Sequence, residues 1–118
     1  MGWDEREKRS FVRANFPCKI IIYTIGREHI IVAHTENIGA GGVRVIIEEC
    51  LDISSQVGLE LFLGGAQIIC KGRIVWVVER SGSSNAEANV WDTGIEFLEI
   101  SERDRKVVGS FVKTIISD

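Results

Sequence analysis

The chain has 118 residues, of which 45% are hydrophobic, and its formal net charge at pH 7 is -3. This length predicts a single domain that can bury its own core without a disulfide or metal. The acidic balance argues against a general nucleic-acid binder, which carries a broad basic face. The charged N-terminus lacks the apolar core of a signal peptide, and the apolar runs are too short for a membrane helix. We therefore expect a cytoplasmic protein without membrane insertion.

Residues 1–14 are polar, charged and without clear periodicity, which predicts an N-terminal arm. Arg9 and Arg13 lie four positions apart in the stretch REKRSFVRANF, so two guanidinium groups could bind phosphates from one side of the arm. Acidic residues are interleaved with the basic ones near the start of the arm. A solvated tail that only keeps the protein soluble is therefore the alternative interpretation.

Six segments rich in β-branched residues follow the arm, separated by glycine-containing or polar turns. Short strands at this spacing predict an all-β fold, either a small antiparallel β-barrel or a sandwich. The predicted strands cover residues 18–24, 28–34, 41–48, 56–63, 66–79 and 89–100.

The hydrophobic period changes at the C-terminus, where residues 101–116 predict a helix with one apolar face. Ser101 precedes Asp104 by three positions, as expected of a helix cap with an acidic first turn. We expect the apolar face to pack on the barrel and close one opening. A face for a partner or a second copy is the alternative.

Cysteines, histidines and tryptophans receive structural interpretations. Cys18, Cys50 and Cys70 are far apart and lack zinc-ligand spacing, and no cofactor is expected. Cys18 and Cys70 are predicted to be buried thiols. We interpret His29 and His34 as structural because no acid or nucleophile lies at a readable spacing, Trp91 as a core residue, and Trp76 as a packing residue or a ligand contact. Without a catalytic constellation, an enzyme is not expected.

A glycine-rich stretch, GAGG at residues 39–42, separates two predicted strands. Glycines there could adopt positive φ and let a ligand approach the main chain closely. Asn37, just before them, offers both a donor and an acceptor. The stretch is neither a P-loop nor a dinucleotide fingerprint, because the required Lys-Ser/Thr and βαβ context are missing. An ordinary glycine-rich hairpin is the alternative.

Taken together, the two stretches resemble the motifs of the PilZ domain family. An RxxxR motif is present as Arg9 to Arg13, and a motif of the type [D/N]xSxxG is present as Asn37 to Gly42. Gly72, Trp76, the run GIEF at 94–97 and the closing helix extend the resemblance over nearly the whole chain. The resemblance implies a six-stranded antiparallel β-barrel that binds cyclic di-GMP, with the arm folding over the ligand. The implied ligand-binding residues are Arg9, Arg13, Asn37, Gly39 and Gly42.

One position departs from the family pattern, since Gly39 stands where the motif has Ser. A missing hydrogen bond costs roughly 0.5–1.5 kcal/mol, so we expect weakened but retained binding. The resulting hypothesis is a cyclic di-GMP receptor that orders its arm and signals to an unidentified protein partner. The first alternative is a PilZ-like adaptor that no longer binds nucleotide. The second, a single-stranded nucleic-acid binder on a β-barrel, is opposed by the acidic pI near 5.4.

Overall fold

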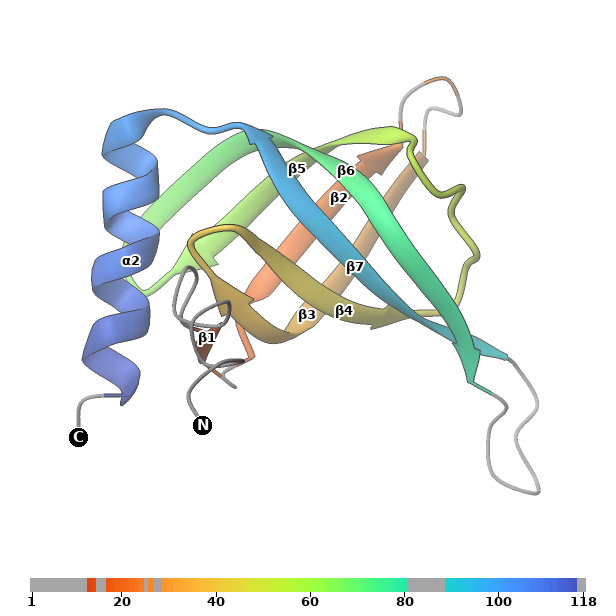
Figure 1. The fold of residues 1–118 in the computed structure, drawn as a ribbon, viewed down its shortest axis with the longest axis horizontal. Helices are drawn as coiled ribbons and strands as arrows, with labels where there is room; N and C mark the ends of the chain where they lie inside the picture. The colour runs from red at the N-terminus through yellow and green to blue at the C-terminus, as the bar shows by residue number, and fades with distance from the viewer. Residues whose placement is uncertain (1–12, 15–16, 25, 27–28, 81–88, 117–118) are drawn as a thin grey trace, which may run out of the picture.

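A computed structural model describes residues 13–14, 17–24, 26, 29–80 and 89–116 (Figure 1). All six predicted strands and the predicted helix are present within one residue of their predicted bounds, except that the second predicted strand ends at Gly39 and not at residue 34. In chain order the elements are β1 (Arg13–Ala14), β2 (Lys19–Thr24), β3 (His29–Gly39), β4 (Gly42–Ile47), β5 (Gln56–Leu63), β6 (Ala66–Arg80), β7 (Val90–Glu99) and α2 (Glu102–Ile116).

The strands form one antiparallel sheet that closes on itself. Its order is β1-β3-β2-β5-β6-β7-β4, and a further pairing of β3 with β4 completes the barrel. Strands β2 to β7 make up the six-stranded antiparallel barrel, which confirms the predicted fold class. The two-residue strand β1 was not predicted; it adds to the edge of β3 beside the turn that leads into β4.

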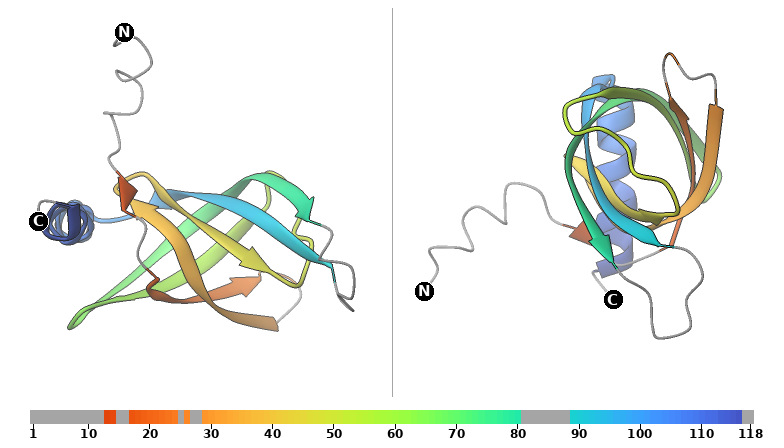
Figure 2. Two further views of the ribbon diagram at one scale, coloured as in Figure 1. Left: turned by 90° about the horizontal axis from the view of Figure 1, so that it is seen from below. Right: turned by 90° about the vertical axis from the view of Figure 1, so that its right-hand side faces the viewer.

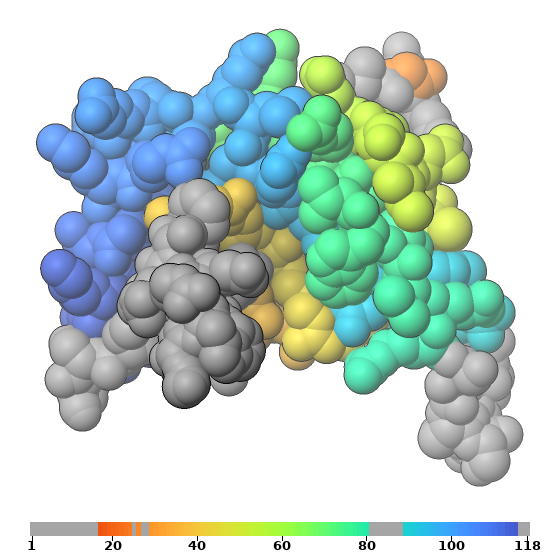
Figure 3. Space-filling view, in the orientation of Figure 1, coloured from red at the N-terminus to blue at the C-terminus, as the bar shows by residue number. Residues whose placement is uncertain are grey.

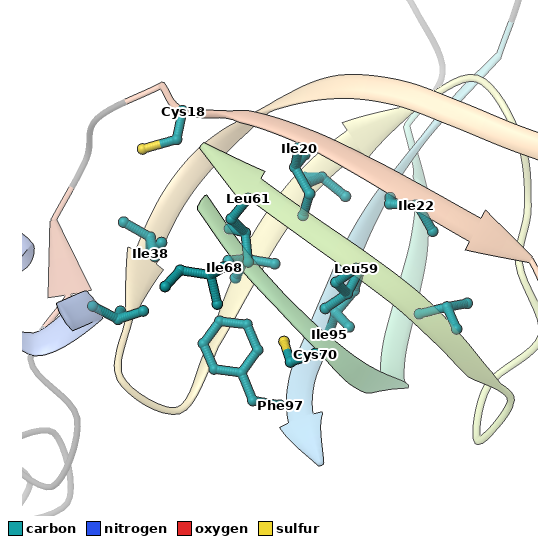
Figure 4. Packing of buried hydrophobic residues seen from close by; sticks show 14 of the residues in the cluster. Cys18, Ile20, Ile22, Ile38, Leu59, Leu61, Ile68, Cys70, Ile95 and Phe97 are labelled. Carbon is teal, nitrogen blue, oxygen red and sulfur yellow. The ribbon is translucent and has the colours of Figure 1, made fainter. Parts of the chain in front are cut away.

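The core fills the barrel because apolar and polar residues alternate along most strands. On β5, every second residue from Val57 to Leu63 is buried, and β2 buries Ile20 and Ile22. Side chains from opposite walls meet in the interior (Figure 4). Cys18 and Cys70 are both buried, as predicted, and burial raises the pKa of the Cys70 thiol to about 11.

Helix α2 lies across one end of the barrel, as the two turned views show (Figure 2). Ser101 caps it: the main-chain N–H of Asp104 donates to the Ser101 hydroxyl oxygen at 3.0 Å. Val108 and Val112 are fully buried and belong to the barrel core. The helix therefore packs on the barrel with its apolar face, as expected.

One interpretation of a single residue was wrong, and one residue has a contact that the sequence did not indicate. Trp91 is half-buried and does not belong to the core, although Ile95 and Phe97 on the same strand do. His29 contacts an acid that is distant in sequence: its Nε2 lies 2.8 Å from a Glu49 carboxylate oxygen. These two residues are 20 positions apart in sequence, so no local spacing could have indicated the contact.

Candidate ligand-binding site

Two β-bulges turn a polar and an aromatic residue onto the outer face of the barrel. In β3 the register with β4 shifts between Thr35 and Asn37, and in β6 the register with β7 shifts between Ile74 and Trp76. Regular alternation would point Asn37 and Trp76 inward, as it does for Thr35 and Ile74, which are buried. The extra residue in each strand reverses this direction, so both side chains line a pocket on the outside.

Glycines form the floor of this pocket, which lies over the outer face of β4, β7 and β6 near the middle of the molecule (Figure 3). A Cβ at Gly94 would overlap the indole of Trp76, so the absence of a side chain lets the ring lie against β7. A Cβ at Gly42 would overlap the carbonyl oxygen of Ile95. The hollow has a volume of about 500 Å³. These close approaches explain why glycine occupies both positions.

Arginines and carboxylates surround the hollow. Arg44 donates two hydrogen bonds of 2.7 Å to Asp92, and this pairing holds the pKa of the Asp92 carboxyl below its usual value. Glu96, on the far side, is hydrogen-bonded by Arg73. Arg105 reaches in from α2, and its guanidinium donates to the carbonyl oxygen of Ala40 at 2.8 Å. Arg105 thus joins the closing helix to the glycine-rich turn.

The register of β1 brings the two sequence motifs together. Arg13 is the direct partner of Gly39, and Ala14 is the partner of Ile38. The last arginine of RxxxR therefore lies, by its main chain, beside the central glycine of the second motif. Gly39 in turn pairs with Gly42 across the turn. Of the five predicted site residues, Asn37 and Gly42 line the pocket, and Gly39 and the main chain of Arg13 pair next to Gly42. Arg9 lies outside the described residues.

The glycine-rich turn differs from its expected geometry. Asn37 and Gly39 still belong to β3, and Gly42 already belongs to β4, so the connection is Ala40 and Gly41 alone. In the described part of the chain, positive φ is found for glycine at Gly26 and Gly64, and not in this turn. Close packing, such as that at Gly42, explains the glycines better than a left-handed backbone does.

Sequence reasoning missed Arg44 and Arg105 as residues of the site. Arg44 stands at an alternating polar position of a strand, which gives a signal for exposure but none for a pocket. Arg105 lies 65 positions from its acceptor Ala40, and nothing in a helical pattern points to that contact.

Within the described ranges, no cluster of His, Cys, Asp and Glu could hold a metal ion, and no helix is both long and apolar enough to cross a membrane.

The fold is that of a small β-barrel domain with one closing helix. The sequence model of the PilZ domain family matches residues 7–114, so the chain belongs to this family. No curated protein sequence matches the chain.

Solved structures of PilZ-containing proteins share the fold. The PilZ domain of YcgR from Escherichia coli, with c-di-GMP, has a TM-score of 0.72 at 13% identity, covering 92% of this chain and 91% of that chain. MotI/DgrA, the Bacillus subtilis inhibitor of motility, has a TM-score of 0.72 at 19% identity, covering 90% of this chain and 50% of that one. MrkH from K. pneumoniae in its apo state has a TM-score of 0.73 at 12% identity, covering 88% of this chain and 47% of that chain. The chain spans about half the length of the MotI and MrkH structures.

Proposed function

We propose that this protein is a receptor for cyclic di-GMP that acts in the bacterial cytoplasm. The observation that carries the proposal is the pairing of Arg13 with Gly39, which joins the RxxxR motif to the second motif beside one pocket. The same pocket is lined by Asn37, Trp76 and Arg105. A cyclic dinucleotide needs this combination of cationic donors, an amide and a flat aromatic surface.

Each group has a part in the proposed binding mode. Arg9 and Arg13 supply forked donors for the phosphates and a planar surface for a guanine base. Asn37 hydrogen-bonds a guanine edge, and Gly39 and Gly42 let the ligand approach the main chain. Binding orders the arm over the ligand, and the changed surface is read by a protein partner. This proposed role requires no cofactor, no catalytic group, no nucleic acid and no membrane insertion.

A second candidate function follows from Gly39, where the family motif has Ser. Loss of that hydroxyl removes a hydrogen bond to the ligand, and a domain that no longer binds nucleotide could act as an adaptor through protein contacts alone. The spacing of Arg9 and Arg13 opposes this candidate, since an adaptor has no need of a paired phosphate donor.

Calorimetric titration of the full chain with cyclic di-GMP, with GTP as the control ligand, distinguishes the two. A receptor gives saturable heat with cyclic di-GMP in the micromolar range and little with GTP. Absence of heat from a folded protein at ligand concentrations of about 1 mM, which corresponds to only about 4 kcal/mol of binding, rejects the receptor and leaves the adaptor.

A further inference from the structure

Strand β3 has an edge that the barrel uses only in part. Its first half, His29–His34, pairs with β2 on one side, whereas its ladder with β4 on the other side begins at Thr35. Strand β4 pairs with β3 no further than Val45, although it continues to Ile47 beside β7. The two strands therefore diverge away from their connecting turn (Figure 1), and a groove of about 680 Å³ lies between them.

The direction of the main-chain groups in this half of β3 can be derived from its pairing. The N–H of Thr35 donates to the Cys18 carbonyl oxygen at 2.9 Å, so odd-numbered residues direct their main-chain groups toward β2. N–H and C=O groups alternate between the two edges of a strand. Ile30, Val32 and His34 consequently direct theirs into the groove. Within the described part of the chain, no strand pairs with them on that side.

The side chains along this edge are apolar and unusually exposed. Ile30 and Val32 are 58% and 60% exposed on the outer face, and Tyr23, the partner of Ile30 on β2, is 39% exposed. Ile31 and Ala33 point the other way and pack against the core. An unpaired edge with exposed β-branched residues is a template for an added strand, which natural proteins usually protect with lysine, proline or a covering segment.

The charge around the groove has one sign. The charged side chains that line it are Glu36, Glu48 and Glu49, accompanied by His29 and His34. Lys19 is the register partner of His34 on the neighbouring strand, at one end of the edge and outside the groove lining. His29 contacts Glu49 at 2.8 Å and so spans the wide end of the groove. An extended segment entering the groove would therefore meet carboxylates along its length.

We propose that the open edge of β3 is a docking site for an extended segment of a partner protein in which Lys or Arg residues alternate with β-branched ones. The segment adds as a strand whose main chain pairs with Ile30, Val32 and His34. Its β-branched side chains lie on the inner face beside Ile31 and Ala33. Its cations lie on the outer face, where their aliphatic stems cover Ile30 and Val32 and their charges meet the glutamates. Main-chain pairing supplies affinity in such complexes and the alternate side chains supply specificity. This site is on a different part of the barrel from the nucleotide pocket and does not depend on nucleotide binding.

A second copy of this chain is the less favourable occupant. Pairing two β3 edges would bring two sets of the same three glutamates together, and opposed like charges destabilise a strand pair. A basic segment removes that repulsion and gains from the carboxylates instead.

A displayed library of random decapeptides, selected on the full chain and counter-selected on Val32→Pro, tests the proposal. Proline at position 32 removes an N–H that faces the groove and leaves the ladder with β2 intact, a position where a strand tolerates proline. Val32→Thr is the matched control, since it keeps the N–H and the β-branched shape. Glu36→Lys combined with Glu48→Lys changes two exposed residues and tests the charge without altering the main chain.

We expect selected peptides to be basic and β-branched in alternation. Their affinity should fall about tenfold or more in Val32→Pro and in the double charge reversal, and stay unchanged in Val32→Thr. Slowed amide exchange at Ile30, Val32 and His34 on peptide binding should confirm strand addition. The proposal is overturned if no peptide separates wild type from folded Val32→Pro, if the selected peptides are acidic, or if wild type forms a dimer that Val32→Pro abolishes.

Discussion

Gly39 is the residue at which this chain departs from the family motif. Gly39 pairs with Arg13 on one side and with Gly42 on the other, and its φ does not lie in the left-handed region. A serine there meets no backbone strain. The backbone conformation at this position is therefore one that a serine adopts.

We expect Gly39→Ser to tighten cyclic di-GMP binding by up to about tenfold, the value of one added hydrogen bond. Calorimetry on both proteins at equal salt measures this. Gly65→Ser is the control, because position 65 has open space and lies in the β5–β6 turn away from the pocket. Equal affinities for wild type and Gly39→Ser would show that no ligand atom reaches this position.

Arg105 is the second residue with a defined consequence. It lines the pocket and donates to the Ala40 carbonyl oxygen, which leaves other guanidinium N–H groups able to meet an anion. Arg105→Met keeps the length of the side chain and removes the charge, so binding of cyclic di-GMP should weaken about tenfold or more. Arg103→Met, at a side chain that is 86% exposed on the same helix, is the control. If both variants bind alike, Arg105 has no part in the site.

At the scale of the elements, strand alternation and the C-terminal apolar period were enough to predict the six strands and α2. The bulge in β6 could not be predicted, because the run VWVV at 75–78 is apolar throughout and offers no alternation from which an inserted residue can be recognised. The outward direction of Trp76 depends on that insertion. The candidate residues around the turn were proposed from motif resemblance, whereas Arg44 and Arg105 reach the pocket through pairing and packing between distant segments.

The contact between β6 and β7 gives a prediction of its own. Gly94→Ala places a methyl group where the Trp76 indole lies, so the ring must move. We expect a loss of about 1–3 kcal/mol in the free energy of unfolding, as for other overpacked sites, together with weaker ligand binding. The indole N–H resonance of Trp76 reports the displacement directly. Gly65→Ala, with nothing near its added Cβ, should change neither quantity. An unmoved indole resonance in Gly94→Ala contradicts the assigned packing.

The whole molecule is acidic, with a net charge of -3, while its proposed ligand carries two phosphates. Binding must therefore depend on a local concentration of arginines against the overall field of the protein. Such a site loses affinity as salt rises, since exposed charges are screened within about 10 Å at 0.1 M ionic strength.

Ligand binding to the folded state alone raises the stability of the whole chain. At a free concentration of cyclic di-GMP near 100 times the dissociation constant, the gain is about 2.7 kcal/mol. For a domain of this size, that gain raises the melting temperature by on the order of 10 °C.

Arg13→Ala should melt like wild type without ligand, because alanine retains the main-chain pairing with Gly39. It should lose most of the shift with ligand, because the phosphate donor is gone. Thermal scans of both proteins without ligand, with cyclic di-GMP and with GTP measure the six melting temperatures. A strongly lowered melting temperature of unliganded Arg13→Ala, together with an undiminished shift on adding cyclic di-GMP, would assign Arg13 a structural role and remove it from the ligand site.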